Sequence, residues 1–181
     1  AYAGLANGGV VIRPVALSNM VREGRETIWS PPLDRRQAAT PQGAFLITSL
    51  LKGVMDRGTG AKARALGVLG PVAGKTGTTD GYRDAWFIGY TPDMAIGVWV
   101  GFDDERPIKL TGAQAALPIW SELAIRLIPR DPQDFEIPVG VVQRKIDPKS
   151  GQLATSQCPE KTVEFFICLL YTSPSPRDAH E

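Results

Sequence analysis

The chain has 181 residues, and 20 lysines and arginines against 19 aspartates and glutamates give a net charge of +1. This balance provides no basic field for nucleic acid, and no apolar run approaches the roughly 20 residues of a membrane span. The N-terminus has no apolar segment typical of a signal peptide. With 43% hydrophobic and 22% charged residues, the composition is typical of a globular protein, and the length predicts one domain with a small appendage.

Histidine is nearly absent, because His180, the second-last residue, is the single one in the sequence. A Ser-His-Asp or Cys-His site needs an imidazole held in a rigid setting, which a chain terminus does not supply. The two cysteines, Cys158 and Cys168, cannot form a four-cysteine zinc site. We therefore expect neither a metal nor a cofactor, and a general base would have to be a lysine or a carboxylate.

The first elements suggest that the chain is a fragment. Residues 1–7 are typical of the last turns of a helix, which the pair Gly8-Gly9 would end. A helix that starts at residue 1 indicates that a preceding segment has been lost. The β-branched, apolar run 10–21 predicts extended chain at a sheet edge, and residues 27–29 predict a short returning strand.

The clearest predicted helix begins at Thr40-Pro41, where threonine can cap and proline can occupy the first helical position. The helix should end before Gly58. Its apolar residues recur at spacings of three and four, so one face is expected to be buried; they are Phe45, Ile47, Leu50, Leu51, Val54 and Met55. A short basic segment, 62–64, follows it.

Three extended runs and another helix complete the main domain. Residues 72–79 predict one strand, and the runs 86–90 and 95–102 flank a turn. Both of the latter runs are apolar on both faces, so we expect antiparallel strands covered by helices on each side. Residues 113–128 predict an amphipathic helix. The predicted fold class is α/β, and more narrowly α+β: an antiparallel sheet flanked by helices.

These patterns divide the chain into four parts. Residues 1–129 form the main domain, and the proline-rich stretch 130–140 is a linker. Residues 141–167 form a small β-hairpin, whose strands we expect at 141–146 and 152–155. The stretch 168–181 resembles translated sequencing-adapter sequence, so we expect a disordered tail of non-native origin. On this interpretation His180 and Cys168 are not native, and Cys158 has no disulfide partner.

The run Lys75–Thr79, with the sequence K-T-G-T-T, is the strongest chemical signal. On a strand, Thr76 and Thr78 would point to one side and Lys75, Gly77 and Thr79 to the other. Glycine lets another backbone approach closely, which suits a substrate lying along a strand edge. An ammonium group beside hydroxyls suits a carboxylate, and a strand N–H can stabilise an oxyanion.

Three other interpretations compete for these residues. A phosphate-binding P-loop would require glycine at position 69, where Leu69 stands, and a helix directly after the lysine. Lys75 considered alone could be a solvated strand lysine. The match S-x-x-K at Ser49–Lys52 is rejected as a nucleophile motif, because Ser49 lies in the middle of the predicted helix rather than at its N-terminus.

Four motifs in order carry a resemblance to class A penicillin-binding proteins. They are Gly58-Thr59-Gly60, Lys75–Thr79, the run Tyr82–Pro92 (YRDAWFIGYTP) and Val98–Gly101 (VWVG), within a similarity that covers residues 1–167. The K-T-G triplet alone is a weak signal, whereas its place in this run of motifs is a strong one. The resemblance implies the fold shared by penicillin-binding transpeptidases and serine β-lactamases, here as a partial domain: the C-terminal part of a transpeptidase domain over 1–129.

The resemblance also implies a function. Such a transpeptidase cross-links peptidoglycan stem peptides that end in D-Ala-D-Ala, and β-lactams acylate its serine. Lys75 and the N–H of Thr78, as half of the oxyanion hole, would be catalytic, and Thr76, Gly77, Thr78 and Thr79 would bind substrate. Arg57, Arg83, Asp84 and Trp86 would support the groove. Two other interpretations remain open. Arg83 and Asp84 could form a plain local ion pair, and Trp86 could be a core residue.

The sequence departs from the family in two motifs. It has neither the S-x-x-K nucleophile nor S-x-N, because Ser18-Asn19-Met20 has asparagine one place too early. We expect both motifs upstream of Ala1, with a glycosyltransferase domain and a membrane anchor, which would place the parent protein outside the cytoplasmic membrane. The fragment would then be inactive alone. Alternatives are a D,D-carboxypeptidase or serine β-lactamase, and a non-catalytic module that binds cell-wall peptide or a partner protein.

Overall fold

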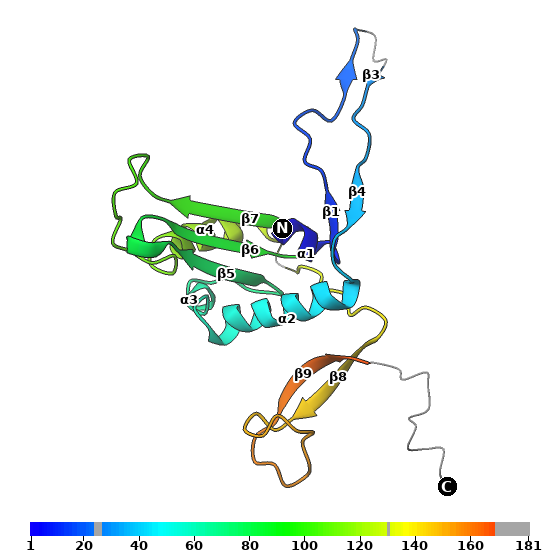
Figure 1. Ribbon diagram of the computed structural model, residues 1–181, viewed down its shortest axis with the longest axis vertical. Helices are drawn as coiled ribbons and strands as arrows, with labels where there is room; N and C mark the ends of the chain where they lie inside the picture. The colour runs from blue at the N-terminus through cyan, green and yellow to red at the C-terminus, as the bar shows by residue number, and fades with distance from the viewer. Residues whose placement is uncertain (24–26, 130, 169–181) are drawn as a thin grey trace. The chain divides into compact units, whose positions relative to one another are not determined.

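The computed structural model describes residues 1–23, 27–129 and 131–168 (Figure 1). It forms two compact units, Ala1–Glu136 and Ile137–Glu181. Apart from Cys168, the predicted tail lies outside the described residues, as does His180. Within the described ranges, no helix has both the length and the apolar character needed to cross a membrane.

The first unit combines helices with three small antiparallel sheets. Its helices are α1 (Tyr2–Ala6), α2 (Pro41–Arg57), α3 (Lys62–Ala65) and α4 (Ala116–Leu127), with a single 3₁₀ turn, η1 (Asp80–Tyr82). Its strands are β1 (Val10–Ile12), β2 (Met20–Val21), β3 (Thr27–Trp29), β4 (Arg35–Gln37), β5 (Ala73–Thr78), β6 (Ala85–Tyr90) and β7 (Ala95–Val100). The basic segment 62–64 is therefore helical, in α3.

The long arm between α1 and α2 is mostly loop. The predicted extended run 10–21 contains only the two short strands β1 and β2, and Pro14 lies between them. Strand β3 pairs antiparallel with β2 and returns the chain, as the sequence predicts. Strand β4 then pairs with β1 at the base of the arm.

Helix α2 begins where the sequence predicts. The hydroxyl of Thr40 accepts a hydrogen bond from the N–H of Gly43 at 3.1 Å, and Pro41 occupies the first position, where no N–H is needed. The helix ends at Arg57, and Gly58 closes it in an extended conformation. Its long contact with β5 fixes that strand against the helix.

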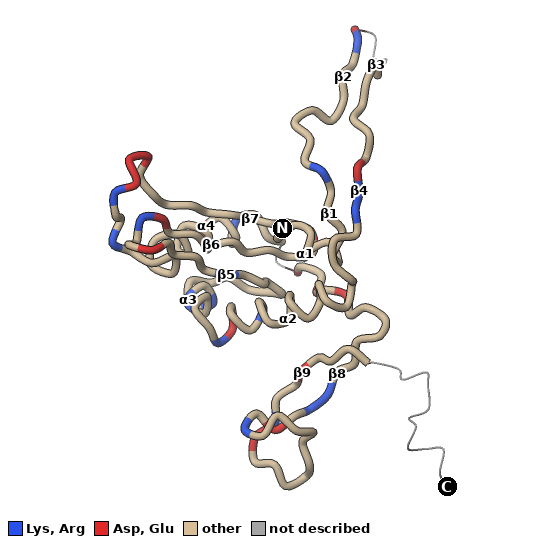
Figure 2. The backbone as a smooth tube through the Cα atoms, viewed as in Figure 1, with Lys and Arg blue, Asp and Glu red and all other residues tan. Residues whose placement is uncertain are grey.

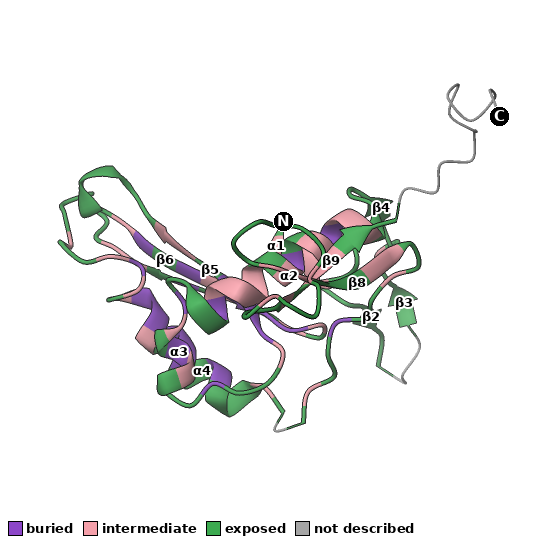
Figure 3. Ribbon diagram, turned by 90° about the horizontal axis from the view of Figure 1, so that it is seen from below, coloured by how far each residue is buried: buried purple, intermediate pink, exposed green. Residues whose placement is uncertain are grey.

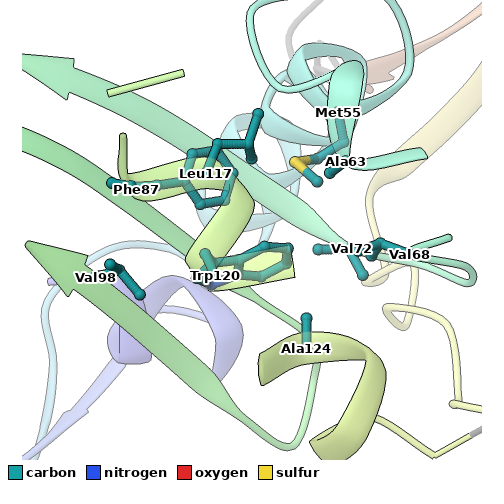
Figure 4. Close-up of a cluster of buried hydrophobic side chains, with 10 residues drawn as sticks. Met55, Ala63, Val68, Val72, Phe87, Val98, Leu117, Trp120 and Ala124 are labelled. Carbon is teal, nitrogen blue, oxygen red and sulfur yellow. The ribbon is translucent and has the colours of Figure 1, made fainter. Parts of the chain in front are cut away.

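The main sheet has the order β5-β6-β7, with both pairs antiparallel (Figure 1). One face packs on α4 and on the C-terminal end of α2. Figure 4 shows Phe87 of β6 and Val98 of β7 around the indole of Trp120, with Met55 close by. The Phe87 and Trp120 rings lie 4.8 Å apart between centroids, and Trp120 Nε1 donates to the carbonyl of Ile96.

The opposite face of the sheet is covered only at one end. There Tyr90 is buried against Tyr2 of α1 and Phe135, with Phe45 and Leu51 of α2 packed nearby. At the other end Trp86 and Trp99 are 41% and 43% exposed. The expectation of helices on each side is therefore wrong for this end of the sheet: in the described residues both tryptophans stay exposed, whereas Figure 3 shows buried segments in β6 and α4.

The second unit contains the hairpin of β8 (Val141–Ile146) and β9 (Thr162–Ile167). The prediction of 152–155 as the partner strand was wrong, since Leu153 makes only one isolated bridge, to Ile146. At the turn, the carboxylate of Asp147 accepts hydrogen bonds from Lys149 N and Ser150 Oγ, which lower the pKa of Asp147. The turn returns the chain so that Ala154 N donates to the carbonyl of Lys145, but the continuous pairing of β8 is with β9.

Tyr90 provides a test of the packing. Its hydroxyl and that of Thr48 lie 3.0 Å apart in the buried interface between α2 and β6. Tyr90→Phe should lower the free energy of unfolding by about 0.5–1.5 kcal/mol, because Thr48 loses its buried partner. Urea denaturation measures this, with the exposed Tyr82→Phe as control; equal losses in both variants would contradict the assignment.

The same residue should give the fold a pH dependence. Burial raises the pKa of Tyr90 above the ordinary tyrosine value of 10.0, although the Thr48 hydrogen bond lowers it. The folded state therefore favours neutral tyrosine, and this stabilisation is present below pH 10 and lost as the pH rises through the raised pKa. The difference in stability between the wild-type chain and Tyr90→Phe should shrink in that range.

A second test concerns Gly89, which lies under Trp120. A Cβ at Gly89 would overlap the Trp120 indole, whereas one at Gly97 on the neighbouring strand would meet Ile88 at an ordinary 3.7 Å. Gly89→Ala should cost about 1–3 kcal/mol of stability through overpacking. Thermal unfolding of both variants measures this, and a Gly89→Ala chain as stable as Gly97→Ala would contradict the packing described above.

Candidate active site

Within the described residues, strand β5 has a neighbouring strand on one side only, so its other edge is open. The N–H of Thr79 donates to the carbonyl of Asp84 at 3.1 Å, on the side of β6. Because N–H groups alternate in direction along a strand, the N–H of Thr78 points to the open edge, as does the carbonyl of Thr76. The backbone thus presents an unused donor at Thr78.

The side chains of β5 alternate between the two faces as the sequence predicts. Thr76 pairs with Phe87 and Thr78 with Ala85, so both threonines lie on the face that packs on α4. Lys75 and Gly77 lie on the other face, opposite Ile88 and Trp86. Two hydroxyls therefore share one side of the open edge.

Contacts from outside β5 hold both hydroxyls. The Oγ1 atoms of Thr59 and Thr76 lie 2.9 Å apart, and Gly112 N donates to Thr78 Oγ1 at 3.0 Å. Because Thr78 Oγ1 accepts this bond, its own proton remains free to be donated to a ligand. Sequence reasoning gave Thr59 no role beyond its motif Gly58-Thr59-Gly60, although that motif was the signal that could have identified it.

The ammonium group of Lys75 lies at the same edge. Its Nζ donates to the carbonyl of Thr76 at 2.8 Å and lies 3.5 Å from Thr76 Oγ1. A positive charge and two hydroxyls next to an outward N–H form a surface that suits a carboxylate beside a polarised carbonyl.

Two glycines allow the surrounding chain to come close. A Cβ at Gly112 would overlap the carbonyl oxygens of Gly77 and Trp86, so only glycine lets this loop lie on the sheet backbone. A Cβ at Gly77 would lie 3.2 Å from the Trp86 Cβ, which is also tight. The Gly112 loop thereby brings its N–H within reach of Thr78.

Thr79 takes part in a network of its own. Its hydroxyl donates to Asp84 Oδ2 at 3.0 Å and accepts from Asp84 N at 2.8 Å. Trp99 Nε1 donates to Asp84 Oδ1 at 2.8 Å. Asp84 therefore orders the turn that follows β5, as one of the sequence interpretations expects, and the Thr79 hydroxyl is directed to this turn.

The other predicted supporting residues are arranged differently. Arg83 forms a long, exposed ion pair with Glu105 at 3.6 Å, which is worth about 0–1 kcal/mol. The guanidinium of Arg57 folds back over Gly53 of its own helix. Trp86 lies beside Trp99, with ring centroids 6.3 Å apart, and is 41% exposed, so its interpretation as a core residue is wrong.

A cavity of about 760 Å³ opens at the end of β5. Its walls come from the end of β5, the turn after it, and the end of β7 with its following loop; they are Thr78, Thr79, Asp80, Arg83, Asp84, Trp99, Phe102, Asp103 and Glu105. Thr78 and Thr79 thus connect the cavity to the edge strand. Among the described residues, no three histidine, cysteine or acidic side chains gather in a way that could hold a metal ion.

The motifs rejected on sequence grounds also fail in the structure. Ser49 lies in the middle of α2, far from its N-terminus. Lys75 lies inside strand β5 and does not open a helix, as a P-loop lysine would.

Two family models match the chain. The model described as penicillin binding protein transpeptidase domain matches residues 1–122. The model described as penicillin-binding protein 1A, C-terminal domain, matches residues 137–167, within the second unit.

Similar proteins with curated names point to the same family. The chain is 33% identical over 163 residues to penicillin-binding protein 1A of Aquifex aeolicus, covering 87% of this chain and 22% of the relative. It is 39% identical over 126 residues to penicillin-binding protein 1A of Pseudomonas aeruginosa, covering 68% of this chain and 15% of the relative. The chain thus spans less than a quarter of the length of these two relatives.

Solved structures match the fold. The crystal structure of penicillin-binding protein 1A from Haemophilus influenzae superposes with a TM-score of 0.80 at 22% identity, covering 96% of this chain and 31% of that one. A ceftriaxone acyl-enzyme complex of penicillin-binding protein A from Mycobacterium tuberculosis superposes with a TM-score of 0.56 at 25% identity, covering 70% of this chain and 30% of that one. With the transpeptidase model covering two thirds of its length, this chain belongs to the penicillin-binding protein transpeptidase domain family.

Proposed function

We propose that this chain supplies the anion-binding and oxyanion-stabilising wall of a serine D,D-transpeptidase that cross-links peptidoglycan stem peptides. The observation that carries the proposal is the open edge of β5. There the N–H of Thr78 points outward, beside the hydroxyls of Thr76 and Thr78 and the ammonium group of Lys75. The acyl-enzyme complex among the structural neighbours supports acylation chemistry in this family.

Each group has a distinct role in this proposal. The hydroxyls of Thr76 and Thr78, with Lys75, bind the terminal carboxylate of a stem peptide ending in D-Ala-D-Ala. The N–H of Thr78 donates to the penultimate carbonyl oxygen, whose negative charge grows as a serine attacks the carbon. The C–N bond then breaks, D-Ala leaves as the amine, and the amine of a second stem takes the acyl group from the serine.

A β-lactam presents a carboxylate beside a strained carbonyl, so the same wall would hold it while the serine opens the ring. The protein that contains this wall would act on the outer side of the cytoplasmic membrane, where peptidoglycan is assembled. We assign no nucleophile to the 181 residues, because the single S-x-x-K match lies inside α2. The serine, and any glycosyltransferase domain, would belong to polypeptide outside this sequence.

The absence of a nucleophile can be tested directly. The chain, incubated with a fluorescent penicillin, should form no covalent adduct, because the serine of its S-x-x-K match, Ser49, lies inside α2 and not at a helix N-terminus. Gel fluorescence and intact mass measure this, with an acylated full-length penicillin-binding protein as positive control. A labelled band that disappears in Ser49→Ala would contradict the proposal.

Thr59 gives a test of the carboxylate site. Thr59→Val removes the hydroxyl that holds Thr76, so affinity for Nα-acetyl-D-Ala-D-Ala should fall by about three- to tenfold, whereas Thr59→Ser should restore it. Isothermal titration or NMR titration of the chain measures the affinity. If Thr59→Val binds the dipeptide as tightly as the wild-type chain, Thr59 does not position Thr76 for the ligand.

A D,D-carboxypeptidase or β-lactamase would use the same wall but pass the acyl group to water. In the parent protein, transfer of the acyl group to an added amine, as opposed to its hydrolysis, separates these functions. A non-catalytic peptide-binding module would bind the dipeptide and leave the parent unlabelled by penicillin.

A further inference from the structure

The basic segment that forms α3 has no part in the proposed function so far, yet its Arg64 binds two other parts of the chain at once. The Nε and Nη2 atoms lie 3.0 and 2.9 Å from Asp56 Oδ1. Nη1 donates to the carbonyls of Val68 and Gly70 at 3.1 and 2.9 Å. Figure 2 shows the basic residues of α3 beside an acidic residue at the C-terminal end of α2. The Arg64 side chain is only 26% exposed, so these contacts are partly shielded from water.

The two parts that Arg64 joins lead to two hydroxyls of the candidate site. Asp56 stands in the last turn of α2, directly before the loop that carries Thr59. Gly70 stands directly before β5, the strand that carries Thr76. Further along, the Oγ1 atoms of Thr59 and Thr76 lie 2.9 Å apart. The same two segments therefore meet at Arg64 and again at the threonine that binds the carboxylate in the proposed function.

The buried side chain of Met55 lies between these two contacts. A Cβ at Gly60 and a Cβ at Gly74 would each lie 2.9 Å from the Met55 sulfur, so the thioether fills the gap between the loop and the strand. A methionine side chain has three rotatable bonds and adapts to gaps of different shape. This packing therefore excludes water without setting the exact separation of the two segments. The directional hydrogen bonds of a planar guanidinium can set it.

The turn at Gly70 is held from its other side as well. Gly70 has a φ of +79°, and a Cβ there would lie 2.6 Å from Pro132 Cγ. The chain then enters β5 through Val72 and Ala73, which are both fully buried. Because a close-packed interior transmits displacements, a shift of the Gly70 turn would be carried into β5.

We propose that Arg64 is a positioning residue for the carboxylate-binding hydroxyl of Thr76. Its guanidinium fixes the separation between the loop after α2 and the start of β5, so that the hydroxyl of Thr59 stays in contact with that of Thr76. The inference rests on the proposed function, in which Thr76 binds the terminal carboxylate of a stem peptide. A lysine in place of Arg64 could keep the ion pair with Asp56, but its single ammonium group lacks the planar fork that also reaches the two carbonyls.

The test measures the affinity of the whole chain for Nα-acetyl-D-Ala-D-Ala by isothermal titration. This affinity should fall about two- to fivefold in Arg64→Gln, and by a similar factor in Arg64→Lys. In the Thr59→Val chain, which already lacks the hydroxyl contact, the added Arg64→Gln change should cause no further loss. The matched control is Arg126→Gln, which breaks an exposed ion pair with Glu122 on α4 and should leave the affinity unchanged.

An unchanged affinity in either Arg64 variant would overturn the inference. Losses that multiply in the double variant would also overturn it, because a general loosening of the chain acts independently of Thr59. Urea denaturation shows which variants are folded. If Arg64→Gln does not fold, Arg64→Lys decides through the same comparison with Thr59→Val.

Failure of the wild-type chain to bind the dipeptide would overturn the proposed function, and the role of Arg64 is then decided without a ligand. In ¹H–¹⁵N NMR spectra of the free chain, Arg64→Gln should move the amide signal of Thr76 in the direction in which Thr59→Val moves it. A Thr76 signal that stays in place, or that moves in an unrelated direction, would show that Arg64 does not act through Thr59.

Discussion

The open edge of β5 is the constraint on which the rest of this structure depends. An edge strand exposes a row of unpaired N–H and C=O groups, which proteins usually cover or interrupt because another chain can pair with it. Here the groups of Thr76 and Thr78 on that edge remain accessible, with a lysine beside them. If a peptide pairs with this strand, as we propose, the strand cannot also be covered, so its rigidity has to come from the face and from the other edge.

The packing supplies that rigidity. Phe87, Met55 and Trp120 form a close-packed layer behind the sheet, as Figure 4 shows, and β6 holds β5 along its whole length. Thr59 from the loop after α2 and Gly112 from the loop before α4 then fix the two threonine hydroxyls. Groups held by three separate segments need little reorganisation when a ligand arrives, which is the physical basis of oxyanion stabilisation.

Local signals predicted much of this fold. The Thr40-Pro41 start of α2 and the alternation of β5 are set by neighbours in the sequence, and both are confirmed. The errors concern long-range pairing: β9 rather than residues 152–155 completes the hairpin, and the end of the sheet at Trp86 and Trp99 has no helical cover in the described residues. Periodicity shows that a face is apolar, but it does not show what lies on it. The Gly58-Thr59-Gly60 motif singles out Thr59, but only the fold shows that its hydroxyl contacts that of Thr76, 17 residues away.

We propose that a peptide carboxylate and its neighbouring carbonyl bind at the outward groups of β5. NMR titration of the ¹⁵N-labelled chain with Nα-acetyl-D-Ala-D-Ala tests it most directly. We predict that the amide signals of Thr76 and Thr78 shift most, while those of β7 and the β8–β9 hairpin stay in place. Shifts confined to other elements, or saturation without any change at Thr78, would contradict it.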